Sequence, residues 1–329
     1  MRVLVLGGTH FLGRHIVEAL LARAHDVTLF HRGNTGLDLF PEASRVLGDR
    51  ATDLDRLPPD ARWDAVVDVA AYVPKDVAAS AGTLRERAAR YVFVSSVSVF
   101  DLDRPEIDES SPMLDLPADA SRDVMVPETY GALKRLCELE AIAAFGADRT
   151  LVVRPGLIVG PYDPTDRFTY WPLRFARGGD VLVPDDLDAR TQWIDARDIA
   201  DFITLAIERG IAGEVNVVGP SRPTTLRDLF ADCAEGAGVA SRLVAVPVET
   251  LDAHGVKGWS DLPCWIARGR GYDAITHVCP MRAEAMGLRH RPLATTLSDT
   301  LRWARDARTN VPLEAGLTPE READILAAL

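Results

Sequence analysis

The chain has 329 residues and a formal net charge of −12, so it is long enough for one large domain with a smaller one attached. The acidic balance argues against a nucleic-acid partner, because a general nucleic-acid surface needs clustered basic residues. No apolar stretch reaches the roughly 18 residues that span a membrane. The four cysteines lack disulfide-like or zinc-like spacing, and the first strand leaves no room for a signal peptide. We therefore expect a cytoplasmic protein without a bound metal.

The first half of the chain alternates apolar strands with amphipathic helices. Strands are predicted near residues 2–7, 26–30, 44–47, 65–69, 90–95 and 150–155. Helical spacing of apolar residues occurs near 11–24, 75–88 and 129–145. This alternation is typical of a doubly wound parallel α/β sheet with helices on both faces.

After Pro155 the pattern becomes less regular, which indicates a smaller, mixed C-terminal lobe. A helix near 197–209 and a strand near 214–218 are expected to return to the sheet. The first domain is therefore assigned to residues 1–158 with 192–218 added, and the lobe to 159–191 and 219–329. Helical patterns recur at 224–237, 294–308 and 318–328, whereas the acidic residues 101–126 are typical of a long surface loop.

A glycine-containing turn follows the first strand, in the sequence Gly7-Gly8-Thr9-His10-Phe11-Leu12-Gly13. Glycine tolerates positive φ and lets the backbone approach a pyrophosphate. The N-terminus of the next helix offers free N–H groups and a positive dipole to phosphate. The pattern predicts a dinucleotide site, although His10 occupies the place of a middle glycine.

A second motif places Tyr130 and Lys134 one helical turn apart. A nearby ammonium favours the phenolate, so we expect Lys134 to lower the pKa of Tyr130 and make it a general acid or base. Ser96 follows the predicted strand 90–95, where its hydroxyl can reach a ligand in the crevice of an open sheet. These three residues are the predicted catalytic set.

Together these motifs resemble the extended short-chain dehydrogenase/reductase superfamily, in its NAD(P)-dependent epimerase/dehydratase group. The likeness extends to an isoflavone-reductase-like branch and to chloroplast stem-loop RNA-associated proteins. It implies a Rossmann-type fold and a substrate-binding C-terminal lobe. Ser96 and Tyr130 would contact the reacting oxygen, and Lys134 would hold the nicotinamide ribose. The resemblance also implies cofactor contacts by Asp49, Arg50, Ala70, Ala71, Pro155 and Gly156, with Asp49 at the adenine.

The residues after the second strand bear on the choice of cofactor. NAD-preferring members of this group carry an acid there that binds the ribose 2′-hydroxyl. This chain has His31 in that place and Arg32 next to it. Because a guanidinium can hold a 2′-phosphate by paired hydrogen bonds, we expect NADP(H) to be preferred over NAD(H).

Departures from the resemblance limit the reaction. Sugar-nucleotide dehydratases place an Asp-Glu pair after the catalytic hydroxyl, where this chain has Val97 and Ser98. Nucleotide-sugar epimerases carry an Asn and a pyrophosphate-binding Arg at the positions of Leu157 and Thr191, and Arg190 is expected to point to the other face of its strand. The leading hypothesis is hydride transfer to or from a carbonyl or carbinol carbon of a small polar metabolite. A sugar epimerase with tightly bound cofactor and a non-catalytic cofactor-sensing or RNA-associated protein are the alternatives.

The substrate is expected at the carboxyl edge of the sheet, under the smaller lobe. The residues predicted to face it are Ser98, Phe100, Tyr162, Tyr170, Trp171 and Arg174. A homodimer is also expected, through the helices at 75–88 and 129–145. The apolar stripes of these helices can equally face the sheet of their own subunit.

Overall fold

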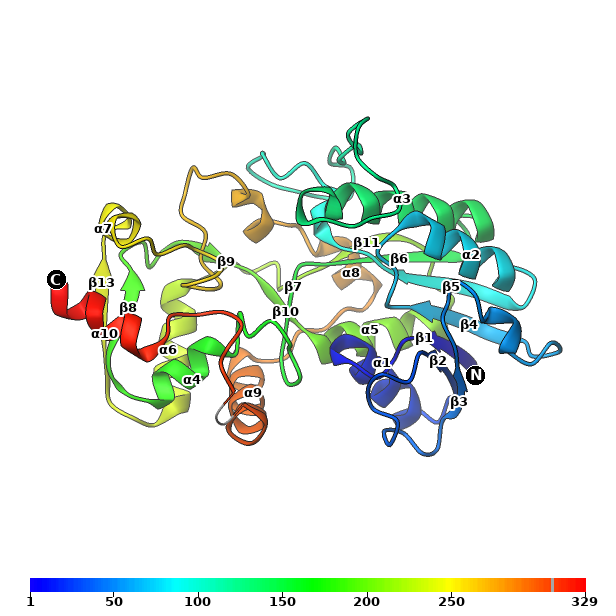
Figure 1. Cartoon of the computed structure of the whole chain (residues 1–329), viewed down its shortest axis with the longest axis horizontal. Helices are drawn as coiled ribbons and strands as arrows, with labels where there is room; N and C mark the ends of the chain where they lie inside the picture. The colour runs from blue at the N-terminus through cyan, green and yellow to red at the C-terminus, as the bar shows by residue number, and fades with distance from the viewer. Residues whose placement is uncertain (309–310) are drawn as a thin grey trace.

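The computed structural model describes residues 1–308 and 311–329, which form two lobes side by side in an elongated molecule (Figure 1). The first lobe contains a seven-stranded parallel sheet in the order β11-β6-β5-β4-β1-β2-β3. Its strands are β1 (Arg2–Leu6), β2 (Asp26–His31), β3 (Ser44–Leu47), β4 (Trp63–Asp68), β5 (Ala88–Val94), β6 (Thr150–Pro155) and β11 (Gly213–Val217). The predicted strands are confirmed, with bounds shifted by no more than two residues.

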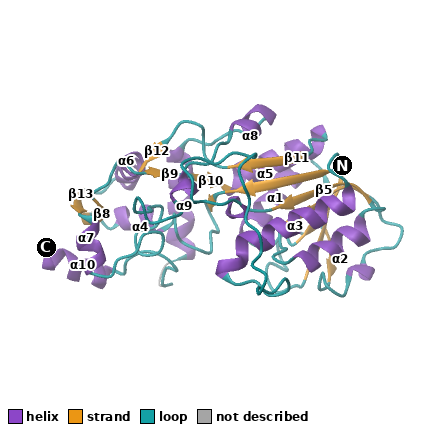
Figure 2. Ribbon diagram, turned by 90° about the horizontal axis from the view of Figure 1, so that it is seen from above, coloured by secondary structure: helices purple, strands orange, loops and turns teal. Residues whose placement is uncertain are grey.

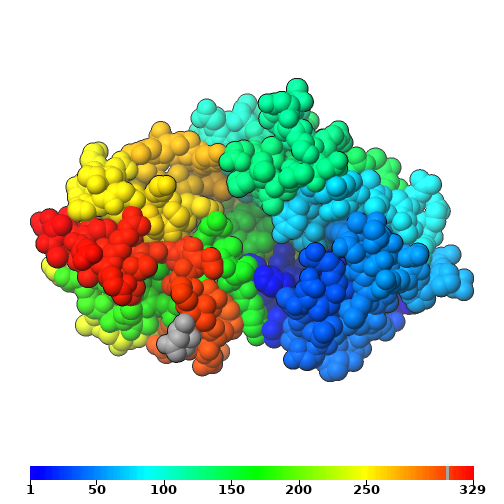
Figure 3. Space-filling view, viewed as in Figure 1, coloured from blue at the N-terminus to red at the C-terminus, as the bar shows by residue number. Residues whose placement is uncertain are grey.

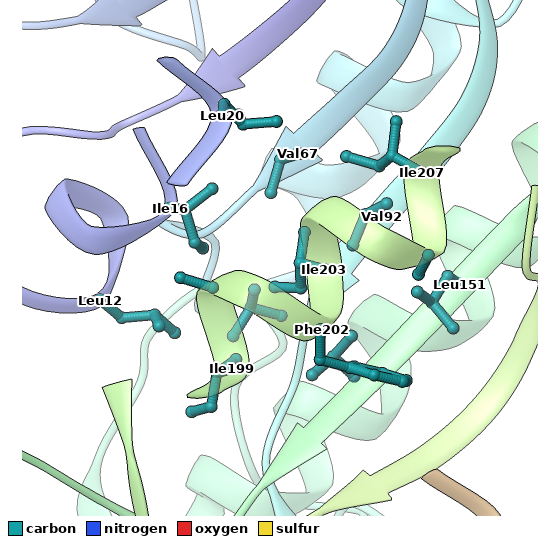
Figure 4. Close-up of a cluster of buried hydrophobic side chains, with 14 of the residues drawn as sticks. Leu12, Ile16, Leu20, Val67, Val92, Leu151, Ile199, Phe202, Ile203 and Ile207 are labelled. Atoms are coloured by element: carbon teal, nitrogen blue, oxygen red, sulfur yellow. The ribbon is translucent and has the colours of Figure 1, made fainter. Parts of the chain in front are cut away.

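Helices cover both faces of this sheet. Alternation along β1 turns Val3 and Val5 to one face and Leu4 and Leu6 to the other. Figure 4 shows the first face, where α1 (Phe11–Ala22) and α5 (Ala196–Arg209) pack on the strands. The second face is covered by α2 (Pro74–Leu84) and α3 (Tyr130–Phe145). Because helices cover both faces, the central strands are largely apolar, which makes them readable in the sequence.

The order of the strands reverses beside β1, which pairs with β2 on one side and β4 on the other. In an open parallel sheet, such a reversal leaves a crevice outside the carboxyl ends of the strands. The chain segments that follow β1, β2, β4 and β5 all start at this edge. The fold therefore gathers the glycine turn, His31-Arg32, Ala70-Ala71 and Ser96 at one end of the sheet.

The second lobe is a mixed assembly of short strands and helices (Figure 2). Three two-stranded sheets pair β7 (Leu157–Val159) with β10 (Trp193–Asp195), β9 (Arg190–Thr191) with β12 (Thr224–Thr225), and β8 (Gly179–Pro184) with β13 (Ser241–Val246). The helices are α4 (Tyr170–Ala176), α6 (Leu226–Ala237), α7 (Val248–Ala253), α8 (Met281–Met286), α9 (Leu293–Ala307) and α10 (Pro319–Ala328). The space-filling view shows the surface furrowed where the two lobes meet (Figure 3).

One helix of the C-terminal segment belongs to the first lobe by its packing. Ala283 of α8 and the following Leu288 are buried in the same cluster as α1 and α5. The expected lobe segment 219–329 therefore crosses back to the sheet at this point. Among the residues described, every helix is too short or too polar to cross a membrane.

Candidate active site

The turn after β1 depends on three glycines. Gly7 and Gly8 have φ of +106° and +96°, in the region that other residues rarely adopt. A Cβ on Gly7 would lie 2.8 Å from Cγ2 of Val69 in the segment after β4. A Cβ on Gly13 would lie 3.0 Å from the backbone of Gly8, so this glycine lets α1 start close against the turn. The turn therefore has the shape that a dinucleotide pyrophosphate requires.

His10 does not disturb this turn. It is the N-cap residue of α1, with ordinary extended backbone angles, φ −133° and ψ 137°, so no glycine is needed at this position. Its side chain is exposed and makes no capping hydrogen bond. The first N–H groups of α1 are therefore left for a ligand. Thr9 Oγ1 lies 2.8 Å from Thr35 Oγ1, which joins the turn to the loop after β2.

The end of β2 offers one exposed cation. His31 is buried, its Nδ1 accepts a hydrogen bond from the N–H of Gly33 at 3.1 Å, and burial together with Arg45 lowers its pKa. The imidazole is therefore neutral at physiological pH. Arg32 next to it is exposed, and no side chain among residues 1–308 and 311–329 pairs with it. The geometry fits a role for Arg32, rather than His31, in binding an anionic group.

Arg50 is used inside the protein and not at a ligand, which corrects the expectation for this residue. Its guanidinium forms an ion pair with the fully buried Asp68, with one N–O distance of 2.8 Å, and donates to Ser80 Oγ at 2.8 Å. Burial would raise the pKa of Asp68, but Arg50 outweighs that effect and lowers it. The hydroxyl of Tyr91 donates to the same carboxylate at 2.6 Å. A buried carboxylate needs such partners, so Arg50 is committed to Asp68.

Asp49, Ala70 and Ala71 lie beside this network at the carboxyl edge of the sheet. The half-buried Asp49 accepts a hydrogen bond from the N–H of Ala51 at 2.9 Å, which shapes the loop after β3. The N–H of Ala70 donates to the buried Asp68 at 3.2 Å. Pro155 ends β6, and a Cβ on Gly156 would lie 3.2 Å from Val218. All of these positions are consistent with a cofactor lying across the strand ends.

Ser96 and Tyr130 meet across a short turn. Ser96 is the N-cap of a 3-10 turn at Val97–Val99, where its Oγ accepts from the N–H of Ser98 and donates to Ser98 Oγ, both at 3.1 Å. Tyr130 is the first residue of α3 and is half-buried. Burial raises the pKa of Tyr130 and outweighs the opposite effect of its hydrogen bond with Ser96. A Cβ on Gly131, the residue after Tyr130, would lie 1.9 Å from the Ser98 carbonyl oxygen, so the start of α3 packs directly on the turn that Ser96 caps.

Lys134 lies on the same helix, but its ammonium is turned into the protein. The side chain is buried, and Nζ donates to the carbonyl oxygens of Ala71 at 2.9 Å and Val94 at 2.7 Å. Burial lowers the pKa of Lys134 to about 8. The expectation that this ammonium lowers the pKa of Tyr130 is therefore wrong for this state of the protein. Helical spacing aligned the two backbone positions, but the long side chain of Lys134 follows the carbonyl groups instead.

Tyr72 is a residue of this site that the sequence analysis missed. It directly follows Ala70-Ala71, is 49% exposed, and its ring centre lies 6.4 Å from that of Tyr130. Its ring is 5.8 Å from Nζ of Lys134. The signal was its position just after a strand that ends at the crevice, but no motif marks the residue type.

Most of the predicted substrate residues lie elsewhere. Tyr170, Trp171 and Arg174 are on α4, buried in the core of the second lobe, and Arg174 forms an ion pair with the buried Glu322 of α10. Phe100 is fully buried under Arg154, whose Cζ is 5.2 Å from its ring centre. These four residues pack in the interior of the protein. The expectation that they contact the substrate is therefore not supported by their positions. Ser98 remains beside Ser96.

Tyr162 joins the two lobes. Its ring lies 3.8 Å from Cζ of Arg14 on α1 and 5.6 Å from the rings of His15 and Trp303. Trp303 belongs to α9 of the second lobe. Tyr162 therefore holds α1 against the second lobe and is not placed as a substrate contact.

A cavity of about 360 Å³ lies beyond the carboxyl end of β11, between the lobes' connecting segments. Its walls come from residues 106–111, from residues 190–193 of β9 and β10, from residues 219–224 after β11, and from residues 276–281. Arg190 and Thr191 both line it, and of these two neighbours Arg190 is exposed whereas Thr191 is buried. No sequence pattern indicates this cavity, because its walls come from four separate segments.

The chain is similar in sequence to proteins of known family. The family model of the NAD-dependent epimerase/dehydratase family matches residues 3–219. The chain belongs to that family. It is 30% identical to 2′-dehydrokanamycin reductase of Streptomyces kanamyceticus over 266 residues, 76% of this chain and 70% of that protein. It is 27% identical, over 77% of this chain and 78% of the other, to a 4-hydroxy-2-methyl-3-oxo-4-farnesyl-3,4-dihydroquinoline-1-oxide ketoreductase of Stigmatella aurantiaca.

Solved structures with low sequence identity to this chain have the same fold. UDP-glucose 4-epimerase of Thermotoga maritima matches with a TM-score of 0.67 and 18% identity, over 94% of this chain and all of that one. The Bordetella bronchiseptica enzyme WbmH, in complex with NAD⁺, matches with a TM-score of 0.69 and 16% identity, over 93% and 99% of the two chains. The Rossmann-type fold is confirmed. As a member of this family, the chain is an NAD(P)-dependent oxidoreductase or epimerase.

Proposed function

We propose that this protein is an NADPH-dependent reductase of a ketone. The observation that carries the proposal is the close contact of Gly131 with Ser98, which places Tyr130 at the start of α3 beside the turn capped by Ser96, at the same edge of the sheet as the glycine turn. The names of three curated relatives support the direction of the reaction. They are 2′-dehydrokanamycin reductase, the farnesyl-dihydroquinoline-oxide ketoreductase and 2-alkyl-3-oxoalkanoate reductase of Stenotrophomonas maltophilia.

The protonation states favour reduction. Burial raises the pKa of Tyr130, so at neutral pH the phenol is protonated and acts as an acid. Tyr130 would give its proton to the carbonyl oxygen as that oxygen becomes an alkoxide, and the Ser96 hydroxyl would donate a hydrogen bond to the same oxygen. When bound, the reduced nicotinamide supplies the hydride to the carbonyl carbon. The buried ammonium of Lys134 would supply a positive charge in the wall of the site near Tyr130.

The chain's own residues would hold the cofactor at several points. The glycine turn and the start of α1 would bind the pyrophosphate through backbone N–H groups. Asp49 would meet the adenine, and the backbone of Ala70, Ala71, Pro155 and Gly156 would border the ribose and nicotinamide. The preference for NADPH rests on the exposed Arg32 and on the absence of a carboxylate at positions 31–33.

The proposal includes a cytoplasmic homodimer. The apolar stripes of α2 and α3 largely face the protein's own sheet, since Val77, Ala81, Leu84 and Leu133 are buried there. Leu139 of α3 is 51% exposed, so its side chain is available to contact a partner subunit. Light scattering on the purified protein, compared with a Leu139→Glu variant, tests this part of the proposal. An unchanged mass for the two proteins contradicts it.

A nucleotide-sugar epimerase is the second candidate, favoured by Arg190. Its exposed side chain lines the cavity beyond β11, where a guanidinium is available to a diphosphate. An epimerase regenerates its cofactor within each turnover, so it would isomerise a sugar nucleotide without net consumption of NADPH. Cofactor that remains bound through purification, with no oxidation of added NADPH, would favour this candidate over the reductase.

The first test is a Tyr130→Phe variant. We expect it to bind NADPH with wild-type affinity but to lose about 10²–10⁴-fold in kcat with a reducible ketone, because the proton donor is removed. NADPH oxidation and calorimetric titration measure the two properties. Tyr272→Phe, an exposed tyrosine on a surface loop, is the matched control. Preserved turnover in Tyr130→Phe would overturn the mechanism.

A further inference from the structure

Five large apolar side chains are exposed around the catalytic tyrosine. They are Tyr72, Leu114, Val124, Met125 and Val126, each between 37% and 60% exposed, and we call them the apolar rim. Three of them are consecutive in sequence and immediately precede the 3-10 turn at Pro127–Thr129 that leads into α3. Burying apolar surface is favourable, so such a group in the open is typical of a binding surface.

Contacts with the residues around Tyr130 position the members of the rim. The Tyr72 ring centre is 6.4 Å from that of Tyr130. Lys75, at the start of α2, forms an ion pair with Asp123 at 3.5 Å, so the segment before Val124 runs beside the residues that follow Tyr72. The carbonyl of Val126 accepts a hydrogen bond from the N–H of Thr129 at 3.1 Å, directly before Tyr130.

Leu114 completes the apolar rim on the other side of Tyr130. Its N–H donates to the carbonyl of Val99 at 2.8 Å, in the turn capped by Ser96. Its Cδ1 lies 3.1 Å from the position that a Cβ on Gly131 would take. In Figures 1 and 3 the segment before α3 projects at the top of the molecule beside that helix. The rim thus surrounds the start of α3 from two loops.

The charges near the rim do not suit an anionic substrate. Lys75 is paired with Asp123, and Arg135 forms an ion pair with Asp115. Glu128, between Val126 and Tyr130, is exposed and adds negative charge. A phosphate or carboxylate at this place would meet an unfavourable potential. An uncharged apolar group would meet only the five side chains.

We propose that the rim binds an uncharged alkyl chain of the substrate, so that the enzyme reduces ketones whose carbonyl is attached to such a chain. This inference rests on the proposed ketone reduction and names the substrate class. The carbonyl lies at Ser96 and Tyr130, and the chain extends over Tyr72 and Val124–Val126. On a half-open surface each added methylene raises kcat/KM about twofold to fourfold until the rim is covered.

The test measures kcat/KM for a series of methyl ketones with about four to twelve carbons. The wild-type enzyme is expected to improve along the series. A Val124→Ser/Met125→Ser double variant is expected to lose this gain, with a loss that grows with chain length, and Val124→Leu/Met125→Leu is expected to restore it. Leu243→Ser, on β13 of the second lobe, is the control with an exposed apolar residue outside the rim. A series that improves equally in the double variant overturns the inference.

A binding measurement separates this inference from the proposed function. A dansyl-labelled dodecyl amide is titrated into the NADPH-bound wild-type and double-variant proteins, and its fluorescence is followed. A tenfold or greater loss of affinity in the double variant supports the rim as an alkyl-chain site, even if no ketone is reduced and the proposed function fails. Equal affinity overturns the inference. Equal affinity together with a change from dimer to monomer assigns the rim to a subunit interface instead.

Discussion

The Cα of Gly131 lies so close to Ser98 that a Cβ on Gly131 would stand 1.9 Å from the Ser98 carbonyl oxygen. No side chain fits in that space. The contact brings the start of α3 against the turn that Ser96 caps. It therefore fixes the position of Tyr130 relative to Ser96, and in the proposed reaction both hydroxyls contact one substrate oxygen.

Gly131→Ala is expected to damage both the fold and the site. The methyl group must push α3 away from residues 97–99, at about 1–3 kcal/mol in the free energy of unfolding. Because a displacement of about 1 Å at a reacting group can lower the rate about 100-fold, we expect kcat to fall by at least that factor. Urea unfolding and NADPH oxidation measure the two effects.

The control for this variant is Gly82→Ala in α2. An added Cβ there meets no atom within 4 Å, and alanine is the better helix former. We expect a stability equal to wild type or higher by up to about 1 kcal/mol, with kcat unaffected. A Gly131→Ala enzyme that matches Gly82→Ala in activity would show that the close contact does not position Tyr130.

Lys134 gives the cofactor-free protein a distinct pH dependence of stability. Its pKa is about 8 in the folded protein, below its usual value of 10.5, because burial disfavours the ammonium. Between these pH values the unfolded chain binds more protons than the folded one, so the free energy of unfolding rises with pH. A shift of this size corresponds to at most about 3 kcal/mol.

Chemical unfolding at several pH values from 7 to about 10 checks this expectation. The wild-type protein should gain stability relative to Lys134→Met as the pH rises through 8, because methionine carries no charge to desolvate. Other titrating groups are common to both proteins and cancel in the difference. Two curves that run parallel over this range would contradict the buried ammonium.

Arg50 is expected to act on stability more than on cofactor binding. Arg50→Met leaves the Asp68 carboxylate buried without its cation, and breaking a buried ion pair from one side typically loses about 3–5 kcal/mol. Arg50→Met/Asp68→Asn removes the charge as well, so part of that loss should be recovered. Thermal unfolding of the two variants measures the difference. A direct cofactor contact would instead appear as weaker NADPH binding with unchanged stability.

Much of the first lobe was predictable from sequence because its strands are buried on both faces. The carboxyl ends of parallel strands meet at one edge, so Ser96 and the glycine turn were placed correctly relative to each other by strand assignment alone. Asp68 shows the limit of this reasoning. Asp68 is buried and pairs with Arg50, which therefore lies in the interior. A sequence does not reveal which arginine pairs with which buried acid.

The second lobe was less readable for the same reason. Arg174 and its partner Glu322 are 148 residues apart, so the burial of α4 was not visible in local sequence. The sequence predicts that Tyr170 and Trp171 face the crevice, whereas in the structure they fill the core of the second lobe. At Lys134 the helical spacing was correct, but spacing fixes the backbone positions and leaves the direction of a long side chain open.

Arg32 offers the most direct test of cofactor choice. Its guanidinium is exposed at the end of β2, beside a neutral and buried His31. If it binds a 2′-phosphate, Arg32→Ser should weaken NADPH binding by about 10–100-fold, because hydrogen bonds to charged groups are typically each worth about 1.5–3 kcal/mol. NADH lacks the phosphate, so its affinity should stay unchanged. Calorimetric titration of cofactor-free protein with both dinucleotides measures the two affinities.

Arg85→Ser is the matched control, since Arg85 is an exposed arginine beyond the end of α2. Its loss should leave both affinities at wild-type values, which separates a local contact from a general effect of net charge. The preference is expected to weaken at high salt, because an exposed ion pair is screened. Equal losses of affinity for NADPH and NADH in Arg32→Ser would mean that Arg32 stabilises the loop and does not bind the 2′-phosphate.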